Sequence, residues 1–116
     1  MAALLDSLIS TISALAGITA YNGHVYKGSA LSGTVLVTVQ RNTPILEGLA
    51  KDEVERPFQL KLYAKDQTSQ DTFLGLIKPA INVGITDGFW KIYDEVPDYT
   101  ESRRNIILYG KQIKVE

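Results

Sequence analysis

Hydrophobic and polar residues follow their clearest pattern in the middle of the chain, over residues 58–81. Every second residue from Phe58 to Ala64 is apolar, which is the period of a half-buried strand. The polar run that follows ends the strand, and Thr68 or Ser69 is placed to cap a helix. An apolar stripe at helical spacing then runs through Phe73, Leu76, Ile77, Ala80 and Ile81. A helix laid on a sheet buries both dry faces, so this segment is predicted to be scaffold.

Other apolar segments predict one more helix and four more strands. The helix is expected over residues 4–16, where leucine and isoleucine fall on one face and Gly17 closes it. The strands are expected at 24–27, 34–40, 89–96 and finally 104–109 with 112–115. Gly110 interrupts the last of them and suggests a bulge or bend.

The strand at 89–96 should place Trp90, Ile92 and Val96 on one face, because side chains alternate along a strand. Residues 97–103 are polar and are predicted to be a connection. The predicted order is helix, strand, strand, long loop, strand, helix, strand, strand. This order favours an α+β fold, a single domain over residues 1–116. It should hold four to five strands in an antiparallel or mixed sheet, with two helices packed on one face.

Residues 41–56 lack a strand pattern and are predicted to form a long loop or arm. Loops of this length are uncommon inside a compact domain and often carry function. Three apolar residues within it need to be covered by the domain or by a partner: Ile45, Leu46 and Leu49. Two interpretations stay open, a mobile hairpin with these side chains tucked back and an arm that binds a neighbouring subunit.

Composition narrows the classes of function. The formal net charge is −1, which argues against a sequence-independent nucleic-acid binder. The chain has no cysteine, so disulfides, thiolate metal sites and cysteine nucleophiles are excluded. The apolar N-terminus lacks a preceding positive charge and contains Asp6, so a helix is expected there and not a secretory signal. It is also too short and too polar to span a bilayer.

Candidate chemistry is sparse. His24 is the only histidine, and it has no carboxylate at a spacing that would orient it as a base. Two acidic groups lack the spacing of a calcium loop and are expected to be solvated: Glu47, Asp52, Glu53 and Glu55, and Asp94, Glu95, Asp98 and Glu101. The six tyrosines suit sheet or interface positions at least as well as stacking on bases. No enzyme activity, metal or cofactor is expected.

Three segments carry a resemblance to a known family. Residues 21–28 follow the first helix, residues 56–66 lead directly into the second helix, and residues 90–95 begin the closing pair of strands. In element order over nearly the whole chain, the sequence resembles the tail-terminator proteins (tail-completion or head–tail joining proteins) of long-tailed bacteriophages and related archaeal viruses. The resemblance implies a virion protein without catalytic residues. It further implies a hexameric ring that caps the tail tube and meets the head connector.

If the resemblance holds, DNA passes through the ring without specific binding. Basic walls would retain phosphate, so one of the two acidic groups is expected to line the lumen. Copies of the chain, the tail tube protein and the head connector are the expected partners. Two alternatives remain, another connector or tail component, and a stand-alone α+β module that binds a ligand between helix and sheet.

Overall fold

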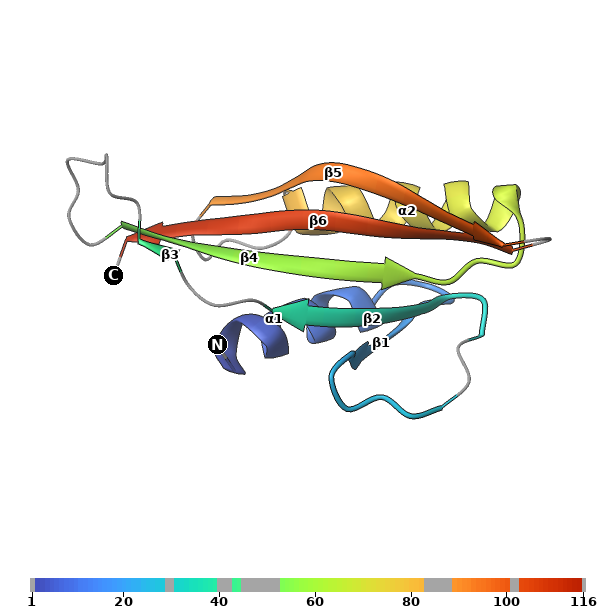
Figure 1. Cartoon of the computed structure of the whole chain (residues 1–116), viewed down its shortest axis with the longest axis horizontal. Helices are drawn as coiled ribbons and strands as arrows, with labels where there is room; N and C mark the ends of the chain where they lie inside the picture. Colours follow the sequence, from blue (N-terminus) through green and yellow to red (C-terminus); the bar gives the residue numbers. More distant parts are fainter. Residues whose placement is uncertain are drawn as a thin grey trace.

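The computed structural model describes residues 2–28, 31–39, 43–44, 53–82, 89–100 and 103–115. Its elements are α1 (Ala2–Ser13), β1 (Thr19–Asn22), β2 (Thr34–Val39), β3 (Thr43–Pro44), β4 (Glu53–Leu62), α2 (Gln67–Asn82), β5 (Phe89–Thr100) and β6 (Arg103–Val115). The strands form one sheet in the order β1-β2-β4-β6-β5, and the two-residue β3 pairs with β4 outside this path (Figure 1). The predicted α+β class is confirmed.

The sheet is mixed because its first pair of strands is parallel. β1 runs parallel to β2, whereas β2 with β4, β4 with β6 and β5 with β6 are antiparallel. The long β4, β5 and β6 extend past the helices, and the molecule measures 48 × 25 × 24 Å along its principal axes (Figure 1). The result is an elongated plate, not a sphere.

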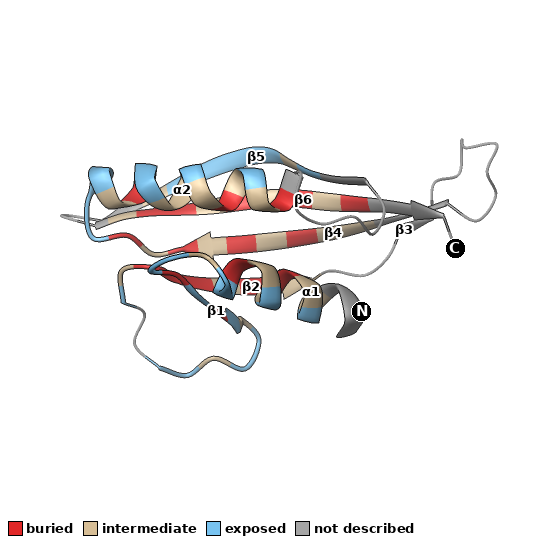
Figure 2. Ribbon diagram, turned by 180° about the vertical axis from the view of Figure 1, so that it is seen from behind, coloured by how far each residue is buried: buried red, intermediate tan, exposed pale blue. Residues whose placement is uncertain are grey.

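Both helices cover the same face of the sheet, as predicted (Figure 2). The apolar stripes of the helices meet the valines of β2 and the alternating residues of β4 and β6 in one core. Its fully buried side chains include Leu8, Ile12, Val35, Val37, Leu60, Leu62, Ile77, Ile81 and Leu108. Each side chain of this size contributes roughly 1.5–3 kcal/mol when it is fully buried. The core therefore holds the helices to a single side and leaves the other side of the sheet uncovered by them.

The second helix is capped by Asp66 and not by Thr68 or Ser69. The carboxylate Oδ1 of Asp66 accepts a hydrogen bond of 2.8 Å from the backbone N–H of Ser69. That bond and one from the Ser69 hydroxyl lower the pKa of Asp66. The predicted cap was wrong because the carboxylate of Asp66, directly before the first helical residue, also reaches the free N–H groups of the first turn.

Two glycines with positive φ shape the connection between α1 and β2. Gly17 has φ 76° and Gly33 has φ 92°. The helix ends at Ser13, earlier than the predicted residue 16, and a turn leads to Gly17. The carbonyl oxygen of Gly33 accepts from Thr19 N at 3.0 Å, while Gly33 N donates to Tyr63 O at 2.8 Å. Gly33 is therefore held between two neighbouring chain segments.

Several predicted strand limits are wrong. The short strand expected at 24–27 lies earlier, at β1, because residues 23–25 form the turn that Asn22 and Gly23 signal. The predicted loop at 41–56 is shorter, because residues 53–56 already pair with residues 112–115 of β6. The polar connection expected at 97–103 is mostly strand, since β5 runs to Thr100 and β6 starts at Arg103. These strand ends have polar sequences, so no apolar pattern predicts them. They form strands because pairing with a neighbouring strand satisfies their backbone N–H and C=O groups.

A β-bulge in β5 changes which residues face the helices. The register shifts between Ile92 and Asp94, so that Tyr93 is an extra residue opposite β6. Ile92 packs against the core, whereas Val96 pairs with Ile107 on the other face and is 40% exposed. The prediction that Ile92 and Val96 share a face was therefore wrong. The irregularity suspected at Gly110 lies in the partner strand, and β6 itself is continuous.

Candidate assembly surfaces

The face of the sheet opposite the helices carries a row of side chains that crosses all five main strands. Backbone register joins Tyr21, Leu36, Lys61, Ile107 and Val96 in this order. Along β2, β4 and β6 their neighbours, such as Val35 and Leu62, are buried beneath the helices, and Val96 pairs with Ile107, so the row lies on the opposite side. Four of its five members are apolar or aromatic. A sheet face of this composition suits contact with another protein surface.

Lys61 places a positive charge in the middle of this row. Its Nζ lies 3.4 Å from Asp98 Oδ2 and 5.4 Å from the centroid of the Tyr63 ring. Partial burial lowers the pKa of Lys61, but the interactions with Tyr63 and Asp98 raise it by more, so the net shift is upward. A partly exposed pair of this kind adds less than about 1 kcal/mol to stability. Its consequence is local, because it holds a charged group in place on an otherwise apolar row.

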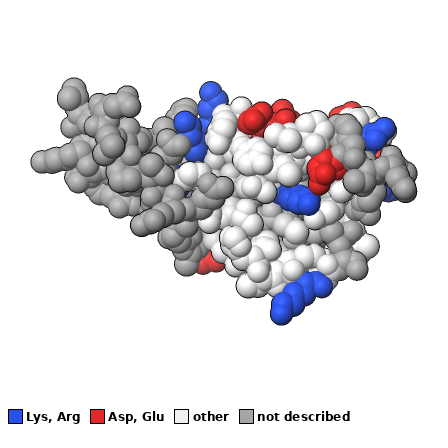
Figure 3. All heavy atoms as spheres, viewed as in Figure 1, with Lys and Arg blue, Asp and Glu red and all other residues white. Residues whose placement is uncertain are grey.

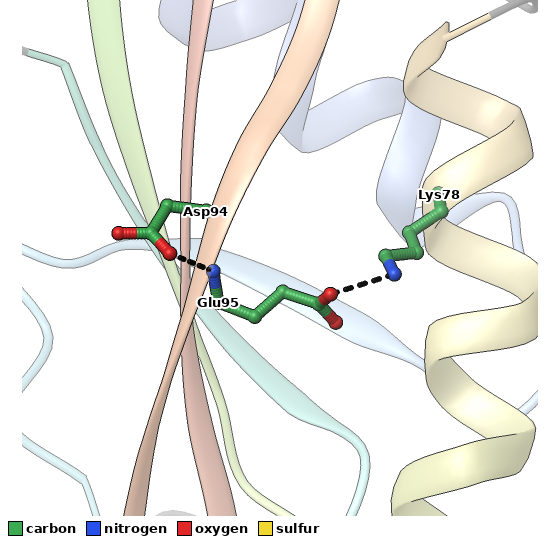
Figure 4. A network of polar contacts seen from close by, with 3 residues as sticks. All are labelled: Lys78, Asp94 and Glu95. Atoms are coloured by element: carbon green, nitrogen blue, oxygen red, sulfur yellow. Dashed lines mark hydrogen bonds and ion pairs between the residues drawn. The ribbon is translucent and has the colours of Figure 1, made fainter.

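The acidic group near Pro97 does not form one surface. Asp94 and Glu95 point to opposite sides of β5 (Figure 4). Glu95 Oε2 accepts from Lys78 Nζ of α2 at 2.8 Å, and Asp98 is paired with Lys61 on the other face. Asp94 Oδ1 accepts only from the backbone N–H of Glu95, at 2.9 Å, among the hydrogen bonds of the described residues. Two of the three described carboxylates are thus offset by lysines, and Glu101 lies outside the described residues.

The other acidic group and the predicted arm fall largely outside the described residues. These include Ile45, Leu46, Leu49, Glu47 and Asp52. Glu53 and Glu55 lie at the start of β4, in register with Val115 and Ile113 of β6. This end of the sheet, where β3 also pairs, lies beyond both helices (Figure 1). The two glutamates are therefore placed at the far end of the plate and not above the core.

The described residues hold neither a cluster of metal-binding side chains nor a helix that could span a membrane. Within the described ranges, no three acidic or histidine side chains gather as a metal site would require. His24 is exposed in a turn, where its backbone N–H donates to Asn22 Oδ1 at 3.0 Å. Neither described helix has the length and apolar character that crossing a bilayer requires.

Tyrosines at the two edges of the sheet supply the exposed aromatic surface among the described side chains. The rings of Tyr21 and Tyr26 lie 4.8 Å apart at 37° beside β1. At the other edge the bulge presents Tyr93, and Lys111 Nζ lies 5.6 Å from the centre of its ring. The sequence assigned tyrosines to sheet or interface positions without choosing among them. Only the strand order shows that these three lie at opposite edges.

No protein-family model matches this sequence, and no curated protein matches it. Surface geometry, together with the resemblance described above, therefore carries the functional argument.

Proposed function

We propose that this protein is a structural component of a virion. Identical copies form a ring, hexameric as in the family the sequence resembles, that caps the tail tube and joins it to the head connector. The observation that carries the proposal is the one-sided cover of the sheet. Both helices lie on one face, and none of the described helices or strands covers the opposite face or the outer sides of β1 and β5, which can therefore meet neighbouring copies and the tube.

Charge on the described part of the chain is compatible with that role. A ring through which DNA passes must not hold phosphate on its inner wall. Of the two acidic groups, the one that contains Glu53 and Glu55 is the better candidate for this wall. The other acidic group is divided between the two faces of β5, and its Glu95 and Asp98 are already paired with lysines.

Electron microscopy of purified tail tubes tests the proposal directly. Added protein should appear as a closed ring at one end of each tube, and native mass measurement should show a single closed oligomer. The tubes alone, and tubes mixed with heat-unfolded protein, serve as controls. A protein that stays monomeric at every concentration and leaves tube ends bare would contradict the proposal.

Replacing Glu55 with lysine should slow DNA ejection from assembled particles while rings remain intact. The new ammonium groups, one per copy, would bind phosphate, and the delay should shrink as salt is raised. Asp71→Lys is the matched control, because it makes the same charge change at an exposed position of α2. Ejection that is equally fast in both variants would remove Glu55 from the lumen.

A further inference from the structure

Exposed apolar side chains gather at the two edges of the sheet. Five large hydrophobic residues are well exposed among the described residues: Tyr21, Val25, Leu31, Tyr93 and Val96. The first three belong to β1 or to the segment that follows it, and the last two belong to β5. Strand order places β1 and β5 at opposite edges of the same sheet. Neither helix contributes a residue to this set, so the large hydrophobic side chains that are exposed among the described residues lie at the edges of the sheet.

Charged side chains at both edges have no ion-pair partner among the described residues. Lys27 follows β1, whereas Asp94 and Lys91 lie in β5, and no ion pair joins any of the three to another described residue. Acidic and basic side chains both lie along the upper edge of the molecule, where β5 and α2 run, and a basic side chain projects from the opposite, lower edge (Figure 3). Both edges expose apolar surface, and Asp94 at one edge and Lys27 at the other can form an ion pair if the two edges meet.

We propose that the β5 edge of one copy packs against the β1 edge of the next, with Asp94 facing Lys27 and Val96 facing Val25. This inference rests on the proposed ring and names the contact that closes it. The contact is head-to-tail, because two different surfaces meet, and its repetition forms a closed ring when the rotation per copy divides a full turn evenly. A two-fold contact of β5 with β5 would instead place Asp94 near its own copy and lose the charge attraction.

Side chains, and not strand addition, should make this contact. Pro97 has no backbone N–H, and the bulge at Tyr93 interrupts the regular spacing of donors and acceptors along β5. At the other edge, β1 has only four residues. Both features oppose a continuous intermolecular sheet, whereas they leave Tyr93 and Val96 available as apolar contacts.

A charge swap tests the assignment. Asp94→Lys and Lys27→Glu should each weaken self-association by about tenfold in sedimentation velocity, and the two together in one chain should restore it. Asp71→Lys and Lys65→Glu are matched controls at exposed positions of α2 and of the β4–α2 connection, and they should leave association unchanged. Unchanged circular dichroism spectra and melting temperatures confirm that each variant folds. Single variants that behave like the controls, or a pair that fails to recover, would overturn the assignment.

Cross-linking tests the head-to-tail direction, because the chain has no native cysteine. A mixture of Val25→Cys and Val96→Cys chains should form interchain disulfides under mild oxidation, and neither variant alone should do so. Disulfides formed by a single variant would indicate a two-fold contact and overturn the inference. If every variant at β1 and β5 still forms rings that cap tail tubes, only the proposed contact between the two edges is wrong. If the charge swap changes self-association but the oligomer does not bind tail tubes, the proposed function is wrong. A strictly monomeric protein would contradict both the function and the edge contact.

Discussion

Replacing Gly33 with alanine should destabilise the protein by about 3 kcal/mol or more, which would lower the melting temperature by roughly 10 °C. Gly33 has φ 92°, which side chains other than hydrogen rarely tolerate. An added Cβ would also collide with the carbonyl oxygen of Gly17 and would lie 3.4 Å from Phe73 Cζ. The backbone cannot move away freely, since Gly33 is hydrogen bonded to Thr19 on one side and to Tyr63 on the other.

Gly75→Ala is the control for this experiment. An added Cβ at Gly75 meets nothing within 4 Å, and the residue lies exposed within α2. The same methyl group should therefore stabilise the protein by about 0.5–1 kcal/mol, because alanine is the better helix former. Denaturant unfolding of both variants measures the two signs side by side. A Gly33→Ala protein as stable as the parent would show that the turn between α1 and β2 can relax.

Periodicity predicted the core because burial acts on short stretches of chain. The alternation from Phe58 to Leu62 and the helical stripe that ends at Ile81 both describe one-sided elements. The valines of β2 behave in the same way, since Val35 and Val37 are fully buried. From such elements the α+β class and the one-sided packing of the helices follow without knowledge of strand order.

Strand order is a long-range property that the sequence did not reveal, and Gly110 signalled a bulge without showing that it lies in β5. The face of Val96 depends on an extra residue at Tyr93, which is stable only because of what lies opposite in β6. Likewise, residues 53–56 become strand because β6 extends far enough to pair with them. Pairing partners that lie far away in the sequence, such as Glu53 and Val115, leave no mark on local periodicity.

The candidate surfaces could likewise be predicted from the sequence only in part. Sequence identified the acidic residues, but only the structure shows that Glu95 and Asp98 are offset by lysines on opposite faces. It also shows that the exposed apolar residues collect at two edges, because that requires knowing that β1 and β5 are the outer strands. The predicted arm with Ile45, Leu46 and Leu49 lies outside the described residues and stays a prediction.

Gly110→Ala should cost about 1–3 kcal/mol through overpacking beside the bulge. Gly110 is in register with Phe58 of β4 and Ile92 of β5, at the point where the register of β5 shifts. An added Cβ would overlap the Phe58 ring, with Cε1 at 2.6 Å, and would lie 2.9 Å from Lys91 O. Phe58 is only 1% exposed, so its ring has little space to move into. The Phe58 ring thus occupies the space that a side chain at position 110 would need.

A double-mutant cycle with Phe58→Leu separates the steric effect from any loss of strand pairing. Phe58→Leu alone should destabilise the protein by about 1–2 kcal/mol, because it leaves a partly filled cavity. If the ring is what excludes a side chain at Gly110, the double variant should be more stable than the sum of the single effects by about 1 kcal/mol or more. Recovery should stay partial, since the contact with the backbone oxygen of Lys91 remains. Strictly additive free energies of unfolding would instead mean that Gly110 is required by the backbone of the hairpin. In that case, the bulge that turns Asp94 and Val96 to the helix-free face would depend on Gly110 itself, independently of the core beneath it.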